Sequence, residues 1–194
     1  METLKAWDYA CFTWVNRDSA NAFFDFIMPW MREAKIWIPL YLLLVGLLVV
    51  RYKKHFWIPL VFAVAAVASA DRISSGLFKP GFERLRPCHD PELSETLVLR
   101  KLDGNCGGQY GFISSHAANH MALALFVFLL YRRRKRSKYF ASLFLWAFAI
   151  SYAQVYVGVH FPGDVLVGMS LGLLLGWMAY YLCQRILEKL NYEF

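Results

Sequence analysis

The stretch VLVGMSLGLLLGWMAYYLCQRIL, residues 165–187, is apolar over almost its whole length. A helix needs about 20 predominantly apolar residues to cross the hydrocarbon of a bilayer. Four more apolar runs precede it: residues 36–50, 56–78, 112–131 and 139–159. The first run is short and is also compatible with a buried helix of a soluble protein, but Lys35 and Arg51 at its ends can reach the two interfaces and extend it. The sequence therefore predicts five transmembrane helices.

Composition agrees with an all-α integral membrane protein. Of the 194 residues, 58% are hydrophobic and 18% charged, against about 45–50% apolar residues in soluble domains. No flexible linker, low-complexity block or internal repeat divides the chain. We therefore expect a single membrane domain over residues 1–194.

The positions of the basic residues predict how the chain is oriented. Segment 51–55 has three Lys and Arg residues, segment 132–138 has six, and the tail after residue 183 has two. Short cytoplasmic loops collect such residues. We therefore place residues 1–35, residues 79–111 and the turn 160–164 outside a bacterial cytoplasmic membrane, on its periplasmic face. The orientation accounts for much of the net charge of +7, so a nucleic-acid partner is not expected.

Residues 7–31 mix aromatic side chains with polar ones, among them Asp8, Arg17 and Asp25. This mixture is typical of a helical segment lying in the membrane interface. The alternative is a sixth crossing with an internal N-terminus, which the acidic residues disfavour. We expect the N-terminal part, residues 1–35, to lie at the outer interface.

Two of the four cysteines, Cys88 and Cys106, fall in the outer segment 79–111. A disulfide is permitted outside the cytoplasm and would stabilise the fold by roughly 3 kcal/mol. A zinc site including His89 is the alternative, but there is no CxxC pair to complete it. The sequence favours the disulfide and predicts no metal.

Three polar clusters lie at the predicted outer ends of helices, and the first is KPGFERLRP, residues 79–87. Lys79, Arg84 and Arg86 can converge on an oxyanion, with the planar guanidinium of Arg86 suited to two phosphate oxygens. An interfacial basic patch that attracts lipid head groups is the simpler alternative.

The second cluster is GFISSHAANH, residues 111–120. Ser114 and Ser115 precede a helical run and can cap it, and the free amides of that helix end can hold an anion. His116 in the first turn could protonate a leaving alkoxide. For His120, one turn later, we expect a packed histidine.

The third cluster is VGVHFPGD, residues 157–164, in which His160 and Asp164 flank the start of the last helix. A carboxylate beside an imidazole fixes its tautomer and stabilises the cation formed when it attacks phosphorus. Favourable interaction of Asp164 with the helix dipole is the structural alternative. All three clusters lie on one predicted membrane face, which indicates a phosphoryl-transfer site without a metal.

These residues resemble the motifs of the type 2 phosphatidic acid phosphatase (PAP2) superfamily, KxxxxxxRP, PSGH and SRxxxxxHxxxD. Lys79 through Pro87 match the first motif in full. Ser114 and His116 match the second, with Ile113 and Ser115 in place of proline and glycine. His160 and Asp164 match the third, with Ala153 and Gln154 in place of serine and arginine. The resemblance covers roughly residues 56–187, the expected catalytic core.

The resemblance implies a phosphohistidine mechanism without a cofactor. It assigns His160 as the nucleophile, Asp164 as the residue that orients it and His116 as the general acid. Lys79, Arg86 and the amides near Ser114 and Ser115 would hold the phosphate. Gln154 can still donate its amide, and Arg84 or Arg72 could supply the cation that the family arginine would have contributed.

The predicted function is hydrolysis of a phosphate monoester or diphosphate of a lipid in the bilayer. The candidate substrates are undecaprenyl diphosphate, phosphatidylglycerol phosphate, phosphatidic acid and lipid A phosphate. Two alternatives stay open: transfer of the phosphoryl group to an acceptor other than water, and a non-catalytic lipid-binding or transport role on the same scaffold. The sequence contains no pattern that indicates the oligomeric state.

Overall fold

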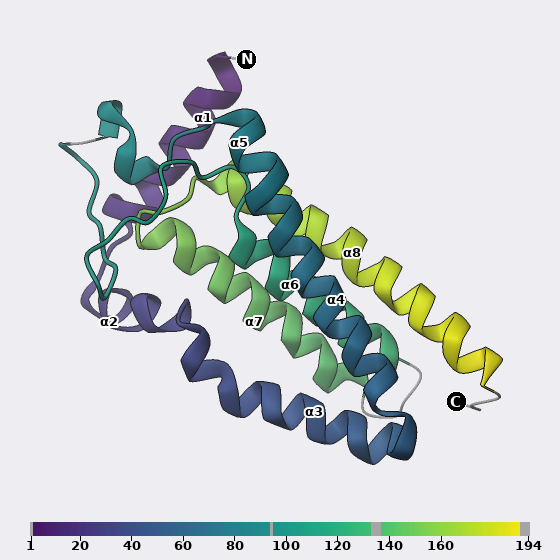
Figure 1. The fold of residues 1–194 in the computed structure, drawn as a ribbon. Coiled ribbons are helices and arrows are strands. Elements are labelled where there is room, and N and C mark those ends of the chain that lie inside the picture. Colours follow the sequence, from purple (N-terminus) through teal and green to yellow (C-terminus); the bar gives the residue numbers. More distant parts are fainter. Residues whose placement is uncertain (1, 94, 133–136, 191–194) are drawn as a thin grey trace.

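The computed structural model describes residues 2–93, 95–132 and 137–190, and these residues form a bundle of helices (Figure 1). The main helices are α3 (Ile38–Tyr52), α4 (Trp57–Ile73), α6 (Ser115–Tyr131), α7 (Ser137–Tyr156) and α8 (Pro162–Lys189). Helix α4 continues through the turn Ser74–Phe78 into the short α5 (Lys79–Phe82). The centre of the predicted basic segment, residues 133–136, lies outside the described residues.

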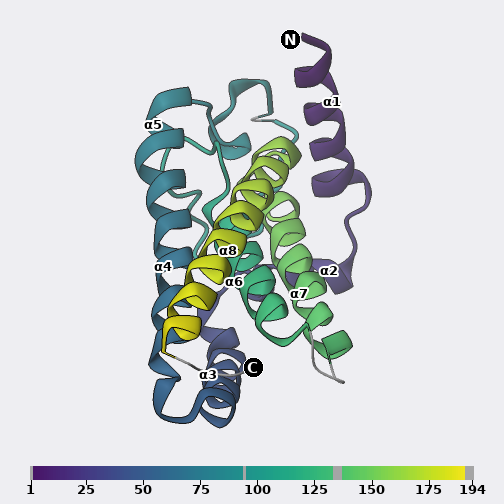
Figure 2. The same cartoon turned by 90° about the vertical axis from the view of Figure 1, so that its right-hand side faces the viewer.

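Four helical segments are long and apolar enough to cross a membrane: Ala34–His55, Trp57–Phe82, Lys138–Tyr156 and Pro162–Lys189. They coincide with four of the five predicted crossings. The fifth, α6, is apolar but has 17 residues, and it packs against α4, α7 and α8 (Figures 1 and 2). Helix α6 is thus the central helix, and five crossings stay a prediction.

The N-terminal segment consists of two short helices rather than one long one. They are α1 (Glu2–Thr13), which continues into the π-helical segment Trp14–Asp18, and α2 (Ala22–Met31). Each is much shorter than the ~20 residues of a crossing. Large side chains such as Trp7, Trp14 and Phe26 are exposed on them, as is typical of elements at a membrane interface.

Helices α6 and α8 are in close contact because three glycines of α8 face the α6 backbone. A methyl group on Gly168 would lie 2.6 Å from the carbonyl oxygen of Ser114, and one on Gly176 would lie 2.5 Å from that of Ala122. Gly172 meets the carbonyl oxygen of Ala118 in the same way. Small residues at this spacing allow close approach of membrane helices. The contact brings the N-terminal ends of α6 and α8 together.

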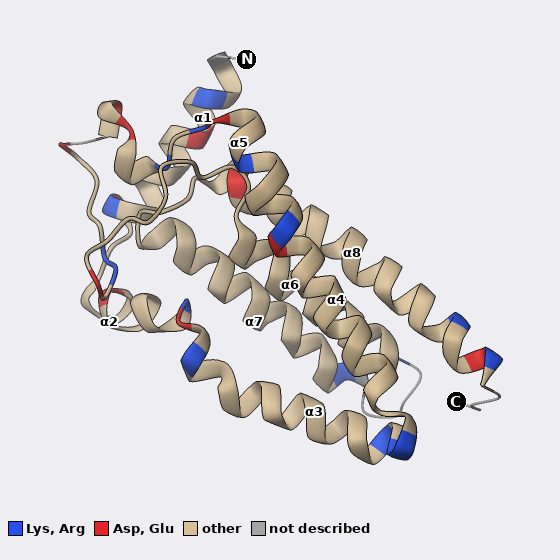
Figure 3. Ribbon diagram, viewed as in Figure 1, with Lys and Arg blue, Asp and Glu red and all other residues tan. Residues whose placement is uncertain are grey.

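Basic residues gather at the opposite end of the bundle (Figure 3). The turn Lys53–His55 follows α3, Arg132 follows α6, Lys138 begins α7, and Lys189 ends α8. The predicted inner segments therefore lie at one end, and the three polar clusters lie at the other.

We predict that Gly176→Ala lowers the free energy of unfolding by about 1–3 kcal/mol, because the added methyl group must push α6 and α8 apart. The measurement is thermal or denaturant unfolding in detergent. Gly46→Ala in α3 is the matched control, since no atom lies within 4 Å of the added carbon. Equal stability of the two variants would contradict tight α6–α8 packing.

Candidate active site

The three polar clusters meet where α5, α6 and α8 approach one another. The backbone N–H of Ser114 donates to the carbonyl oxygen of Asp164 at 3.0 Å, which joins the second cluster to the third. The first cluster is held by a hydrogen bond from Gly111 N to the carbonyl oxygen of Arg84 at 2.8 Å. Gly111 also leaves room for neighbours, because a methyl group there would lie 3.1 Å from Arg86 and 3.2 Å from Asp164.

His160 and Asp164 lie side by side and are both buried, with exposed fractions of 2% and 0%. His160 Nδ1 is 3.5 Å from Asp164 Oδ2, at the outer limit for a hydrogen bond. The same carboxylate oxygen accepts the backbone N–H of Phe161 at 3.0 Å, at the N-terminus of α8. The structure therefore brings the Asp164 carboxylate beside the imidazole, and the orienting role of Asp164 stays a prediction.

Arg84 contacts carboxylates on two other elements. Its Nη1 lies 2.8 Å from Oδ1 of Asp164, and its Nη2 lies 2.5 Å from Oδ2 of Asp8 in α1. The guanidinium also covers the ring of Phe161. This geometry favours a role for Arg84 in holding Asp164 over the predicted role in the phosphate cradle.

Asp8 is a site-supporting residue that the sequence patterns did not reveal. Besides binding Arg84, its Oδ1 accepts the backbone N–H of Gly163 at 2.7 Å. A carboxylate at a helix N-terminus is favoured by the helix dipole. The only signal in the sequence was an acidic residue in an otherwise apolar and aromatic segment.

The start of α6 forms the other side of the site. Ser114 is the N-cap, and its hydroxyl accepts the backbone N–H of Ala117, as expected. The hydroxyl of Ser115 receives hydrogen bonds from Ser74 at 2.7 Å and from Lys79 Nζ at 3.2 Å. Lys79 is thereby held beside the first turn of α6, where His116 lies.

Gln154 and Arg72 do not take up positions in a cation cluster. The Gln154 side chain is fully buried, and its Nε2 donates to Ile150 O in the same helix at 3.4 Å. Arg72 is exposed on α4. His120 is packed as predicted, with its Nδ1 2.7 Å from His116 O and its Nε2 3.3 Å from the Tyr41 hydroxyl.

Burial sets the protonation state of His160. It lowers the pKa of His160 to about 4, outweighing the opposite effect of the neighbouring Asp164 carboxylate. The ordinary histidine pKa is about 6.5. The imidazole is therefore neutral at pH 7 and has a lone pair available for nucleophilic attack.

An elongated cavity of about 660 Å³ lies between α3, α4 and α6 and reaches the start of α6. One end is polar and is lined by Asp71, Ser115, His116, Asn119 and His120. The remainder is apolar, and its lining includes Leu44, Leu48, Leu60, Ala63, Val64, Leu123 and Val127. A polar end next to an apolar channel matches the shape of an amphiphile.

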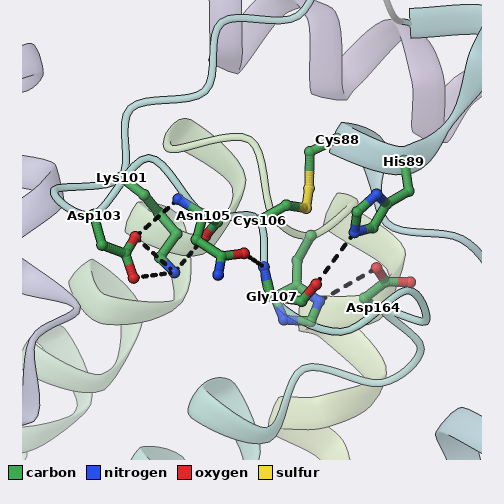
Figure 4. The surroundings of a disulfide bond; sticks show 9 residues. Cys88, His89, Lys101, Asp103, Asn105, Cys106, Gly107 and Asp164 are labelled. Carbon is green, nitrogen blue, oxygen red and sulfur yellow. Dashed lines mark hydrogen bonds and ion pairs between the residues drawn. A yellow bond between two sulfur atoms is a disulfide. The ribbon is translucent and has the colours of Figure 1, made fainter.

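A disulfide joins Cys88 and Cys106 in the segment between α5 and α6 (Figure 4). The adjoining turn is tied down by Lys101, whose Nζ donates to the carbonyl oxygen of Asn105 at 2.5 Å. His89 Nε2 lies 3.2 Å from Gly107 O. The pairing is the predicted one, and it uses both thiols that the alternative zinc site would need.

Comparison with known proteins agrees with the motif pattern. Residues 56–188 match the sequence profile of the PAP2 superfamily. Lipid A 4'-phosphatase of Bacteroides thetaiotaomicron is 33% identical over 174 residues, covering 88% of this chain and 75% of that protein. Phosphatidylglycerophosphatase B of Bacillus subtilis is 30% identical over 131 residues, covering 64% of this chain and 57% of that protein.

The fold is also similar to a solved structure. The crystal structure of a transmembrane PAP2 type phosphatidylglycerolphosphate phosphatase from Bacillus subtilis superposes with a TM-score of 0.70 at 21% identity. The match covers 97% of this chain and 88% of that one. The helical arrangement around the candidate site is therefore one that membrane PAP2 phosphatases share.

We predict that Arg84→Met lowers the free energy of unfolding by about 2–3 kcal/mol, because it leaves the buried Asp164 carboxylate without its ion pair. Arg84 is 28% exposed, so the loss is smaller than for a fully buried pair. Arg17→Met is the control, since Arg17 pairs with Asp18 at an exposed position and should change stability by less than about 1 kcal/mol. Equal effects in unfolding experiments would contradict the assigned role.

The lowered pKa of His160 predicts a pH-dependent contribution to stability. Below about pH 6.5 the unfolded chain binds a proton at this residue that the folded protein does not accept until about pH 4. Parent protein should therefore lose stability relative to His160→Gln as the pH falls from about 6.5 to 4, and the difference should be constant above pH 7. A pH-independent difference in unfolding free energy would rule out a buried neutral imidazole.

Proposed function

Since the chain belongs to the PAP2 superfamily, we propose that it hydrolyses the phosphate of a lipid A-type glycolipid at the outer face of the membrane. The coarser conclusion, a membrane lipid phosphatase, follows from the family, from the named relatives and from the apolar helices. The observation that carries the proposed mechanism is the buried, neutral His160 beside Asp164.

In the first step His160 attacks phosphorus through Nε2, while Nδ1 faces Asp164. The bond between phosphorus and the lipid oxygen breaks, and His116, which is protonated when the phosphate dianion is bound beside it, gives its proton to that oxygen. Asp164 stabilises the positive charge that develops on the phosphorylated imidazole. Lys79, Arg86 and the amides at the start of α6 stabilise the phosphoryl oxygens.

In the second step water attacks the phosphohistidine. His116, now neutral, accepts a proton from the water, the bond between phosphorus and nitrogen breaks, and inorganic phosphate leaves. Both histidines return to their starting protonation states. Since the protein side chains supply both proton transfer and charge stabilisation, the cycle requires no metal.

The cavity beside α3, α4 and α6 supports a lipid substrate. Its apolar part suits acyl chains, and its polar end contains His116 and Ser115. The site lies at the end of the bundle opposite the basic turns (Figure 3), and the charge bias supports an orientation with that end outside the cytoplasm. The substrate would thus enter from the outer leaflet with its phosphate at the helix ends.

Lipid A phosphate is favoured among the candidate substrates by the lipid A 4'-phosphatase from Bacteroides thetaiotaomicron, which matches 88% of this chain. Phosphatidylglycerol phosphate is second, because the relative and the structure from Bacillus subtilis carry that activity in their names. The two candidates differ in head group, a phosphorylated sugar against a phosphorylated glycerol, and a direct comparison separates them.

The experiment is release of inorganic phosphate from lipid A, phosphatidylglycerol phosphate, phosphatidic acid and undecaprenyl diphosphate in detergent micelles containing EDTA. We expect release to be fastest from lipid A and to fall by at least about 10⁴-fold in His160→Ala, as in the loss of other catalytic nucleophiles. A rapid quench in alkaline denaturant, which preserves the acid-labile phosphorus–nitrogen bond, should retain phosphate on the parent enzyme but not on His160→Ala.

The remaining outcomes separate the alternatives. Release only when an alcohol or second lipid is added indicates a phosphotransferase. Binding of lipid without release by well-folded protein indicates the non-catalytic role, and faster release from another lipid overturns the substrate assignment alone.

A further inference from the structure

We propose that Arg32, from the turn that follows α2, binds the substrate phosphate together with Arg86 and fills the position left by Gln154. The inference rests on the proposed phosphatase function and names a phosphate-binding residue outside all three motifs. It also replaces Arg84 and Arg72, which the sequence suggested for this role. Arg84 is bound by two carboxylates and Arg72 is exposed.

Arg32 is half-buried, and it has no salt bridge in the described part of the chain. Its Nε and Nη1 atoms are inaccessible and have no hydrogen-bond partner among the described residues. Burial lowers the pKa of Arg32, and the acidic residues Glu33 and Asp103 only partly offset that effect. A buried charge of this kind is costly unless something pairs with it.

Arg86 also has a buried guanidinium nitrogen, Nε, without a hydrogen-bond partner among the described residues. It lies close enough to Arg32 for the two positive charges to repel. Burial lowers the pKa of Arg86, and the positive charge of Arg32 lowers it further. Two partly buried guanidinium groups that repel each other are unfavourable on their own, and a phosphate dianion between them would remove the repulsion.

The surroundings of Arg32 connect it to the catalytic end of α6. The charge of Arg32 also acts on His116, and Ala34, two residues further on, lines the same cavity as His116. The turn is fixed because the indole Nε1 of Trp37 donates to Met31 O at 2.8 Å. Trp37 in turn packs edge-on against Trp146 of α7. Arg32 is thus held in place by contacts that leave its guanidinium free for the anion.

This placement explains how the site functions without the third-motif arginine. Gln154 lies on α7 with its side chain directed along its own helix. Arg32 reaches the site from the adjacent N-terminal segment, which packs on α7 through α2. The guanidinium is therefore supplied by a different element, and the number of cations at the phosphate, Lys79, Arg86 and Arg32, is preserved.

The test uses full-length Arg32→Ala, with Arg17→Ala as the control at an exposed position of the same N-terminal segment. The readouts are kcat/KM for lipid hydrolysis, the inhibition constant of inorganic phosphate, and the rise in melting temperature on adding phosphate. Loss of one charged hydrogen-bond donor predicts a fall in kcat/KM and a rise in the inhibition constant of about 10- to 100-fold. Arg17→Ala should stay within about twofold of the parent.

A purely structural role would lower the melting temperature in the absence of phosphate but leave the inhibition constant unchanged. Well-folded Arg32→Ala with a parent-like inhibition constant would therefore overturn the proposal. If Arg32→Ala does not fold, Arg32→Gln, which keeps the length and polarity of the side chain, gives the same comparison.

Phosphate binding also separates this proposal from the proposed function. Parent protein that is stabilised by inorganic phosphate through Arg32 but hydrolyses no lipid would support the anion site and reject the phosphatase. If the parent protein and Arg32→Ala hydrolyse lipid equally fast, the result would support the phosphatase function and reject the role of Arg32 in phosphate binding.

Discussion

The close contact between α6 and α8 is the constraint on which the rest of the structure depends. Glycines 168, 172 and 176 let the two helix backbones touch, and no larger residue would permit that separation. The contact fixes the distance between the two helix N-terminal ends, where His116 lies on one and Asp164 on the other. The backbone hydrogen bond from Ser114 to Asp164 is a direct consequence. Helix packing that stabilises the bundle therefore also builds the site.

Asp164 is the charge around which the site is organised. A fully buried carboxylate is unfavourable unless hydrogen bonds and an opposite charge compensate it, and the Phe161 amide and Arg84 provide that compensation. Arg84 is in turn held by Asp8, so the N-terminal helix α1 helps to hold Asp164, which lies beside the proposed nucleophile His160. An element that the sequence placed at the membrane interface is thus also a part of the site's electrostatic framework.

Features that depend on a local sequence pattern could be predicted from the sequence. Apolar length identified the main helices, and motif spacing identified Lys79, Arg86, His116, His160 and Asp164 as one set. The sequence predicted a crossing at residues 112–131, where the described helix α6 has 17 residues and lies at the centre of the bundle. It could not assign the partners of Arg84, because Asp8 and Asp164 are 76 and 80 residues away along the chain. The sequence did not single out Arg32, which we propose binds the phosphate, because a single cation beside an apolar run is indistinguishable from an interfacial anchor.

The arginines around the site are of two kinds, which differ in whether a carboxylate of the protein pairs with them. Arg84 is paired with carboxylates and has no spare charge for a ligand, whereas Arg32 and Arg86 keep buried donors without partners in the described chain. Ion pairing stabilises the folded protein, whereas an unpaired buried cation lowers its stability. Binding of an anion to that cation would raise the stability again. Proteins retain such a cost where function requires it. The distribution of paired and unpaired arginines therefore separates the framework of this site from the surface that we propose receives the phosphate, a distinction that motif matching alone does not make.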